Sequence, residues 1–418
     1  MKKDIFGRFV HQNLFNTLLR PIEAIIASIS PIIDQESDSQ KLFGTVADFV
    51  RKLLFVYLEQ VSSLRSLPLE LMTNLKCRDL GLLYTPFSTL KDGFSRFQSK
   101  HFKELFETVL ASTKLKSIKG IDEMGLFRVI DGSLFPTLLQ IGWSEYRKAK
   151  NAFKLHLCFE LNRMIPTEFV VGSGKSSERI FLESILQAGV TYIADRGYAS
   201  FEIIAKLLKA DAYFIFRVKD NLLIEVQERL EIAIEELPKC FKNVTDELII
   251  LSNDKYQNVV RHIQFEVCQS KCRLIINRRD LTTLQIIVMY AYRWQIELFF
   301  KYLKRTLNGL HLLNHSQNGV EIQFYLLMTL ACLLMKFKQD CQGKKKSGRK
   351  KNRAEQTESE KKKEEGPAEW IKNISKIFYE SWKISKNWLL IVKNSLSKVV
   401  DNELLTMLNS SGNSYAAQ

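Results

Sequence analysis

The sequence predicts an α/β protein in which a mixed-sheet core is interrupted by a mostly β insertion and flanked by helical regions at both ends. Three observations support this fold class. Apolar residues recur at helical spacing up to about residue 118. Residues 153–161 alternate between apolar and polar side chains, which is the period of a half-buried strand. Two further apolar runs each lead into an aspartate, and helix-like segments separate the strands.

The composition limits the class of protein. The 418 residues are enough for two or three domains, and the formal net charge of +15 points to a polyanion such as nucleic acid or a membrane surface. A basic protein without such a partner remains the alternative. The seven cysteines show no disulfide framework and no paired zinc ligands, which indicates reduced thiols in a cytosol. No signal-peptide core opens the sequence and the apolar run 324–335 is too short to cross a bilayer, so we expect a cytoplasmic protein with no membrane partner.

Residues 1–118 are expected to form a helical domain. The stretches VADFVRKLLFVYLEQVSSL (46–64) and FKELFETVLAS (102–112) both carry apolar residues at helical spacing. Basic residues are scattered through this region. A DNA-binding domain fits this pattern, but a plain helical domain fits it as well, because no helix-turn-helix is recognisable.

Residues 119–218 supply the first part of the core. The strand LFRVI (126–130) runs into Asp131, and the strand VTYIA (190–194) ends on Asp195. A hairpin and a helix are expected between them. Open sheets place their sites at strand ends, where a carboxylate can hold a hard cation. Taken singly, each aspartate is better explained as part of a turn.

Residues 219–281 are expected to form the insertion, with a charged helix-like piece at 226–237 followed by several strands. The core resumes at 282–340 with YAYRWQIELFFKYLK (290–304), which we predict to be one helix because it has no Gly and no Pro. At about 100° per residue, five polar side chains fall within an arc of roughly 80°. These are Tyr290, Arg293, Glu297, Lys301 and Lys304. For the helix alone, a solvated face with an Arg293–Glu297 pair is the favoured explanation.

Together, Asp131, Asp195 and Glu297 change that interpretation. Three carboxylates on a mixed sheet are what two divalent ions need in order to cleave a phosphodiester, one ion acting on the attacking oxygen and the other on the leaving oxygen. Cations beside the third acid would then hold the phosphate backbone. The mixture of acid and bases in the 290–304 segment is explained if Glu297 binds metal while its neighbours bind DNA.

The segment also matches a known signature. Tyr290, Arg293, Glu297 and Lys304 have the spacing of the helix motif in the DDE transposases of the insertion-sequence 4 family, and DGS at 131–133 and DRGY at 195–198 resemble its two aspartate motifs. The resemblance covers residues 120–340. It implies an RNase H-like catalytic core, Mg²⁺ as the ion (Mn²⁺ serving in vitro), and a homodimer that pairs two ends of double-stranded transposon DNA in a bacterial cytoplasm.

The resemblance also implies site roles. Asp131, Asp195 and Glu297 would be the catalytic metal ligands, and Tyr290, Arg293 and Lys304 would hold DNA phosphates. Lys301, from the same helix face, and Arg196, beside the second aspartate, are further DNA-binding candidates. The implied reaction is cut-and-paste transposition at terminal inverted repeats. A catalytically inactive DNA-binding relic or inhibitor, or an RNase H-like nuclease acting on structured nucleic acid, remain the alternatives.

The C-terminal part divides into two segments. Residues 341–367 are rich in charge and poor in apolar side chains, so we expect a disordered linker. Residues 368–418 return to helical amphipathicity and are a candidate dimer contact. The GSGKS segment at 172–176 resembles a nucleotide-binding loop, but such a loop requires glycine at position 169, which is Phe169. No nucleotide is therefore expected.

Overall fold

The computed structural model describes most of the chain between residues 45 and 353. Short gaps interrupt it at 138–141, 148–149, 234–236, 238–240, 253, 268–269 and 308, and three short pieces before residue 45 (19–20, 22–28 and 30–31) are also described. The chain forms two compact units. Unit 1 comprises Met1–Tyr198, Lys209–Ala212 and Arg293–Gly343, and unit 2 comprises Ala199–Leu208, Tyr213–Tyr292 and Lys344–Gln418.

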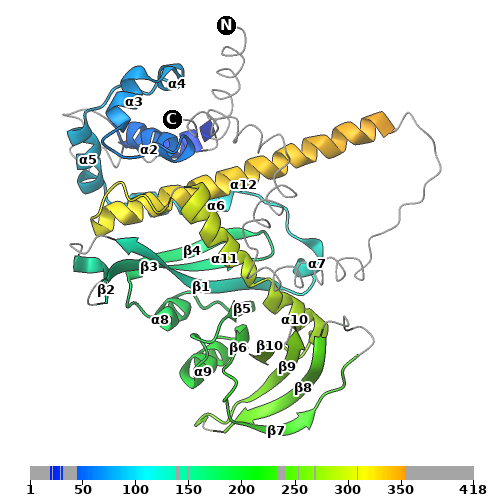
Figure 1. The fold of residues 1–418 in the computed structure, drawn as a ribbon. Helices are drawn as coiled ribbons and strands as arrows, with labels where there is room; N and C mark the ends of the chain where they lie inside the picture. Colours follow the sequence, from blue (N-terminus) through cyan, green and yellow to red (C-terminus); the bar gives the residue numbers. More distant parts are fainter. Residues whose placement is uncertain are drawn as a thin grey trace. The chain divides into compact units, whose positions relative to one another are not determined.

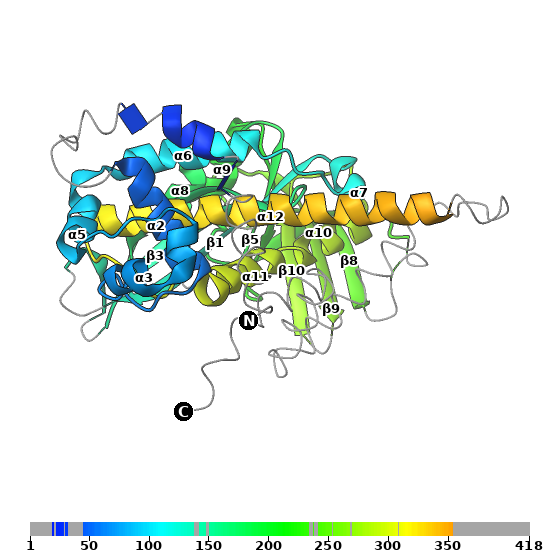
Figure 2. The same ribbon diagram turned by 90° about the horizontal axis from the view of Figure 1, so that it is seen from above.

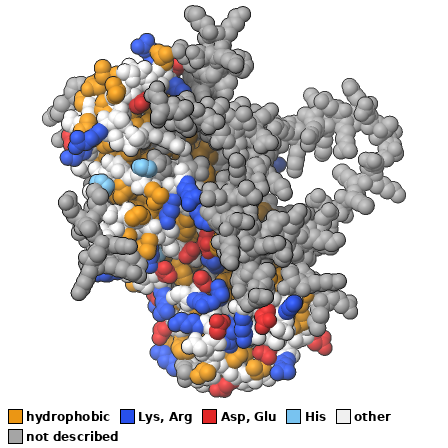
Figure 3. Space-filling view, viewed as in Figure 1, with side chains coloured by type: hydrophobic (Ala, Val, Ile, Leu, Met, Phe, Trp, Pro, Cys, Tyr) orange, Lys and Arg blue, Asp and Glu red, His pale blue; other side chains and the backbone are white. Residues whose placement is uncertain are grey.

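The N-terminal part of unit 1 is helical, as predicted. Its helices are α2 (Val46–Leu58), α3 (Leu67–Thr73), α4 (Leu75–Asp79), α5 (Phe87–Arg96), α6 (Ser99–Ser112) and α7 (Lys119–Asp122). Thr45 caps α2 by accepting a hydrogen bond from the Asp48 amide. Phe49 of α2 packs against Phe94 and Phe97, with ring centroids 5.1 and 5.4 Å apart. On the face seen in Figure 3, apolar side chains are exposed among basic ones over these helices. The most exposed are Leu69, Met72, Leu83 and Tyr84.

The sheet of unit 1 is mixed. Strand β1 (Leu126–Thr137) pairs antiparallel with β3 (Lys150–Glu160) and parallel with β5 (Val190–Ala194). On the far side, β3 pairs with β4 (Ile165–Ser173) and with the short β2 (Glu145–Arg147). Figure 1 shows α6, α11 (Trp294–Lys301) and α12 (Gln317–Arg353) over one face of this sheet and α8 (Glu178–Ser184) over the other. A mixed sheet flanked by helices confirms the predicted fold class.

Because helices cover both faces, β3 is not the half-buried strand that its alternation predicted. His156 and Glu160, which were expected on a wet face, are only 2% and 4% exposed. On one face Phe153 packs against Phe324 of α12, with centroids 5.4 Å apart. On the other, the His156 ring stacks on Phe181 of α8 at 5.7 Å. The polar side chains of β3 are therefore interior groups that need partners.

Helix α12 is longer than the sequence indicated. It continues to Arg353, so residues 341–353 are helical and not part of the linker predicted from 341. Its segment Gln317–Phe337, 21 residues with a mean hydropathy of 1.6, is long enough to span a membrane, which corrects the prediction that the apolar run is too short. That segment is 67% buried by the rest of the protein, as the core helix of a soluble protein is. Figure 2 shows α12 as one unbroken helix. The predicted C-terminal helical region, 368–418, lies outside the described residues.

Unit 2 contains the predicted β insertion. Its strands are β6 (Tyr213–Arg217), β7 (Ile224–Arg229), β8 (Phe241–Leu251), β9 (Val259–Val267) and β10 (Ser270–Ile276), in the order β6-β10-β9-β8-β7 with antiparallel pairing. It also contains α9 (Phe201–Lys209), apart from that helix's last residue, and α10 (Thr283–Ala291). The charged piece predicted as helix-like begins instead with the exposed strand β7. Charged side chains suit an edge strand because they discourage further pairing. Buried Arg261 and Asp246 join β8 and β9 with two hydrogen bonds of 2.8 and 2.6 Å.

Candidate active site

The register of β1 and β5 brings the two predicted aspartates together. The last pair between these parallel strands is Val129 with Ile193. Asp131 and Asp195 each follow two residues later, so they lie opposite one another where the two strands part. Neighbouring strands are about 4.8 Å apart. Asp195 directly follows the end of β5, as predicted. Asp131 is not past the end of its strand, because β1 continues along β3 to Thr137 after its pairing with β5 has stopped.

Each aspartate is fixed by the amide that follows it. The Gly132 N–H donates to Asp131 Oδ1 and the Arg196 N–H donates to Asp195 Oδ1, both at 2.8 Å. Burial raises the pKa of the Asp131 carboxyl to about 6. Glu297 and Glu178 raise it further, whereas Arg293 and the Gly132 N–H oppose the shift. Ionisation of Asp131 at neutral pH therefore lowers the stability of the folded protein.

Glu297 joins the pair through Arg293. The Arg293 guanidinium donates from Nη2 to Glu297 Oε1 at 2.7 Å, and its Nη1 lies 3.8 Å from Asp131 Oδ2. The Arg293 side chain is only 13% exposed. The i,i+4 pair predicted for a solvated helix face is thus present, but it is half enclosed and includes the first aspartate. One cation lies between two acids that come from β1 and α11.

The segment 290–304 is not one continuous helix, contrary to the prediction. Helix α10 ends at Ala291, a turn follows at Tyr292 and Arg293, and α11 begins at Trp294. The backbone at Arg293 keeps helical angles (φ −49°, ψ −32°), so the interruption lies in the hydrogen bonding. Tyr290 is 8% exposed and belongs to unit 2, whereas Arg293, Glu297 and Lys304 belong to unit 1. Tyr290 and the other four residues of the predicted arc therefore belong to different units.

The last member of the predicted arc, Lys304, lies in an irregular turn. Residues Tyr302–Thr306 form a π-helix (η4), whose wider turn changes the angle between successive residues. This turn directs Lys304 at strand β1. Its Nζ donates to Ser133 Oγ at 2.7 Å and to the Leu134 carbonyl at 2.9 Å, and it lies 4.5 Å from the centre of the Phe135 ring. Lys304 therefore fastens the segment after Glu297 to the strand that carries Asp131.

The two remaining candidates differ in exposure. Lys301 lies with its Nζ 5.3 Å from the centre of the Trp294 ring, and burial lowers the pKa of its ammonium to about 8. Arg196 is exposed beside Asp195. Sequence reasoning missed Glu178 of α8, whose carboxylate lies against the glycines that follow both aspartates. The glycines that follow the two acids, at 132 and 197, are visible in the sequence, but no local pattern connects them with Glu178.

The donor set suits a hard divalent cation, because carboxylate oxygens are the ligands such ions prefer. No group of three or more His, Cys, Asp or Glu residues in the described part of the chain is arranged closely enough to hold a metal ion. Arg293 bridges Asp131 and Glu297. The carboxylate oxygens of Asp131, Asp195 and Glu297 would suit a divalent ion by their chemistry, and the strand register brings the two aspartates to the same place.

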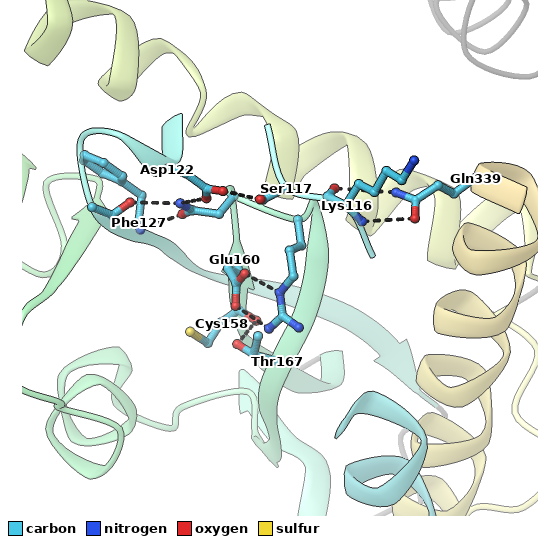
Figure 4. A network of polar contacts seen from close by, with 11 residues as sticks. Lys116, Ser117, Asp122, Phe127, Cys158, Glu160, Thr167 and Gln339 are labelled. Atoms are coloured by element: carbon cyan, nitrogen blue, oxygen red, sulfur yellow. Dashed lines mark hydrogen bonds and ion pairs between the residues drawn. The ribbon is translucent and has the colours of Figure 1, made fainter. Parts of the chain in front are cut away.

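A second polar cluster lies at the opposite end of β1, and Figure 4 shows it. It surrounds a hollow of about 440 Å³ lined by Ser117, Asp122, Gly125, Leu126, Glu160, Asn162 and Arg163. The Asn162 side chain accepts a hydrogen bond from the Phe127 amide at 2.9 Å and donates to Asp122 and to the Gly125 carbonyl, both at 2.8 Å. Arg163 pairs with Glu160 through two hydrogen bonds of 2.6 and 2.7 Å. These polar groups are hydrogen-bonded to one another. We therefore interpret the cluster as a structural joint, that is, a set of contacts that holds neighbouring segments together.

Comparison with known proteins finds similarity over the part of the chain that contains these three acids. A family model described as "Transposase DDE domain" matches residues 123–335. The chain is 26% identical over 217 residues to a putative transposase, y4zB, of Sinorhizobium fredii, covering 50% of this chain and 60% of that protein. It is 23% identical over 269 residues to a probable transposase for insertion sequence element IS5377 of Geobacillus stearothermophilus, covering 61% and 69%. A putative transposase for insertion sequence element IS4SA of Synechocystis is 23% identical over 260 residues, covering 58% and 70%.

Proposed function

Because this chain belongs to the transposase DDE-domain family, we propose that it is the transposase of an insertion sequence, binding the terminal inverted repeats and cutting and joining DNA strands. One observation supports the catalytic part above all others. The β1–β5 register places Asp131 opposite Asp195, and Arg293 ties Glu297 to Asp131. A relic without catalytic function has no need of this arrangement.

Asp131, Asp195 and Glu297 would hold the divalent ions, Mg²⁺ in the cell. When bound, the ions supply activation of the attacking oxygen and stabilisation of the leaving oxygen. The protein supplies the frame. Gly132 and Arg196 orient the aspartates through their amides, and Lys304 holds the segment after Glu297 on β1.

Arg293 has two roles in this proposal. Without DNA it neutralises Asp131 and Glu297, which otherwise repel one another. With Asp131 and Glu297 holding a divalent ion, the planar guanidinium of Arg293 would be free to bind a DNA phosphate through two parallel hydrogen bonds. Metal and DNA would thus replace the internal partners of Arg293 in one exchange.

The other DNA contacts are proposed with different weight. Arg196 is exposed beside Asp195 and can reach a phosphate without breaking an internal contact that holds the site together. Lys304 would have to leave Ser133 and Leu134, so we assign it a positioning role first and a phosphate contact second. Tyr290 remains a candidate from the motif, and Lys301 remains one from the helix face. Sequence-specific recognition is proposed for the N-terminal helices of residues 1–118, and pairing of the DNA ends for a homodimer.

A cleavage assay on labelled DNA carrying the element's end tests the function. Purified protein with Mg²⁺ should nick the end, while Asp131→Asn, Asp195→Asn and Glu297→Gln should bind the same DNA but leave it uncut. Cleavage by any of these variants would remove that acid from the site. End binding without cleavage by the unaltered protein would support the relic. Cutting of RNA–DNA hybrids without regard to the end sequence would support the nuclease.

A further inference from the structure

Glu178 lies beneath the two aspartates, on the face of the sheet opposite Glu297. The Asp131 side chain faces α11, where it meets Arg293, so the next residue on the strand, Gly132, faces α8. A Cβ atom at Gly132 would lie 3.1 Å from Glu178 Oε1, and one at Gly197 would lie 2.9 Å from Glu178 Oε2. One oxygen of a single carboxylate therefore lies against each of the two segments that carry an aspartate. Glycine at both positions is what allows this approach.

Lys154 holds this carboxylate in place. Its Nζ donates to Glu178 Oε1 at 3.2 Å and to the Ser176 carbonyl at 3.4 Å. The side chains of Lys154 and Glu178 are 17% and 28% exposed, so their charges act through a partly buried medium in which screening by water is reduced. Glu178 thus contributes a fourth negative charge close to Asp131, and Lys154 offsets part of it.

Two buried polar atoms show that the α8 side of the acids is a built polar environment. Ser176 Oγ donates to the Ser173 carbonyl at 2.6 Å, so it accepts from His156 Nε2 at 2.8 Å. The His156 Nδ1 atom is then an acceptor, and it lies 3.4 Å from where a Cβ of Gly132 would be. This Nδ1 and the hydroxyl of Tyr198 are both buried and have no hydrogen-bond partner among the described residues. Such atoms are rare in interiors and commonly accompany functional sites.

We propose that Glu178 is a positioning residue for the metal site, holding the Asp131 and Asp195 segments from below and adding negative charge that favours divalent cations. This inference rests on the proposed function, since it assumes that the two aspartates bind metal. Glu178 touches the glycines and not the reacting atoms, so its action is through the ligands. Partners of this kind contribute about 10–100-fold to metal affinity where they have been removed.

The test measures Mn²⁺ binding to the full chain without DNA, by electron paramagnetic resonance of the free ion at pH 8. Glu178→Gln keeps the shape of the side chain and removes its charge, so Mn²⁺ affinity should fall about tenfold. Lys154→Met removes the charge that opposes Glu178, so affinity should rise by about threefold. Glu178→Asp keeps the charge and should restore part of the binding.

The opposite signs separate a charge effect from damage to the fold. If both variants lose affinity together and their melting temperatures fall with it, Glu178 and Lys154 only stabilise α8 and the proposal is overturned. Unchanged affinity in Glu178→Gln overturns it as well. Asp131→Asn is the reference variant. If it too binds Mn²⁺ like the unaltered protein, the proposed metal site itself is wrong, whereas a loss confined to Asp131→Asn refutes Glu178 alone.

Discussion

The two ends of the β1–β5 pair contain similar residues in opposite conditions. Near Leu126, the Asn162 side chain satisfies two backbone groups and Asp122, and Arg163 satisfies Glu160 (Figure 4). At the other end, burial raises the pKa of the Asp131 carboxyl to about 6, and the charges of Glu297 and Glu178 add to this shift. Near Leu126, the polar side chains are hydrogen-bonded to one another. At the other end, Asp131 and Glu297 share the Arg293 guanidinium, and Glu178 adds a negative charge that Lys154 offsets in part.

The difference shows how polar groups that look alike in a sequence are told apart by a structure. Partners that match in number and charge make a joint, and substitution there costs stability. Groups that are left mismatched lower stability until a ligand supplies what is missing. Opposite responses to substitution at the two ends are therefore expected, and the following experiments measure them.

Asn162→Ala should have the largest effect on stability. It leaves the buried Phe127 amide without its partner, at about 1–3 kcal/mol, while the Gly125 carbonyl belongs to an exposed residue that water can reach. The expected loss in the free energy of unfolding, including the weaker exposed bonds, is about 2–4 kcal/mol, measured by urea denaturation. Asn221→Ala, at an exposed asparagine in a turn of unit 2, is the control and should change it by less than about 0.5 kcal/mol. Equal effects of the two substitutions would show that the hydrogen bonds of Asn162 do not stabilise the fold.

Asp131→Asn should stabilise the protein while it abolishes cleavage. The folded state raises the pKa of Asp131 from 3.8 to about 6, so it binds the proton more tightly than the unfolded state does. Stability due to this group is present below pH 3.8 and is lost as the pH rises to 6. At about 1.4 kcal/mol per pKa unit, the asparagine variant should be about 2–3 kcal/mol more stable at pH 8. The gain should vanish near pH 4, and a gain that is independent of pH would contradict this cause.

Arg293→Ala should affect metal and DNA in opposite directions. Removing the cation between Asp131 and Glu297 should raise the Mn²⁺ affinity of the DNA-free protein several-fold. It should lower the single-turnover cleavage rate at saturating DNA by more than about threefold, beyond the sub-kcal effect of a surface pair. Arg293→Lys should not restore cleavage fully, because an ammonium cannot make two parallel bonds. A normal rate in Arg293→Ala would leave Arg293 as a structural pair only.

His156→Gln should show its effect in the pH dependence of stability below neutral pH. Burial, and then Lys154, lower the pKa of the His156 imidazole from 6.5 to about 4, so the folded state holds it neutral. The unfolded state binds the proton first, and the free energy of unfolding falls by up to about 1.4 kcal/mol per unit as the pH drops from 6.5 towards 4. The variant should have a shallower slope in that window in urea titrations at several pH values. His262 in unit 2 has a similarly lowered pKa and should leave a residual slope.

The sequence was sufficient where short-range patterns coincide with the tertiary structure. The helical N-terminal part, the β insertion and the placement of Asp195 after its strand were all predicted, because periodicity and turn residues act locally. It was insufficient where tertiary contacts decide. The alternation in residues 153–161 predicted an exposed His156, because a local pattern carries no information about a second layer of helices. Residues 341–353 looked unfolded because composition carries no information on the helix that precedes them.

The segment 290–304 is the clearest limit. A helix without Gly or Pro gave no reason to expect an interruption at Tyr292 or a π-helix at Tyr302. The prediction paired Arg293 with Glu297 correctly, since four residues within one turn tolerate small errors in angle. Glu178 could not be assigned from the sequence because its partners, Gly132 and Gly197, lie 46 and 19 positions away along the chain. It is the fold that brings Glu178, on one face of the sheet, close to the segments that carry Asp131 and Asp195.

The π-helix at Tyr302–Thr306 has a consequence for how this protein tolerates change in length. A π turn is equivalent to an α-helix that has gained one residue. Removing one residue here would restore an ordinary helix and leave the segments on either side in place. The neighbour Arg305 would then take the place from which Lys304 reaches Ser133. A single-codon deletion, which elsewhere in a helix shifts a whole buried face, would here exchange one basic side chain for the next.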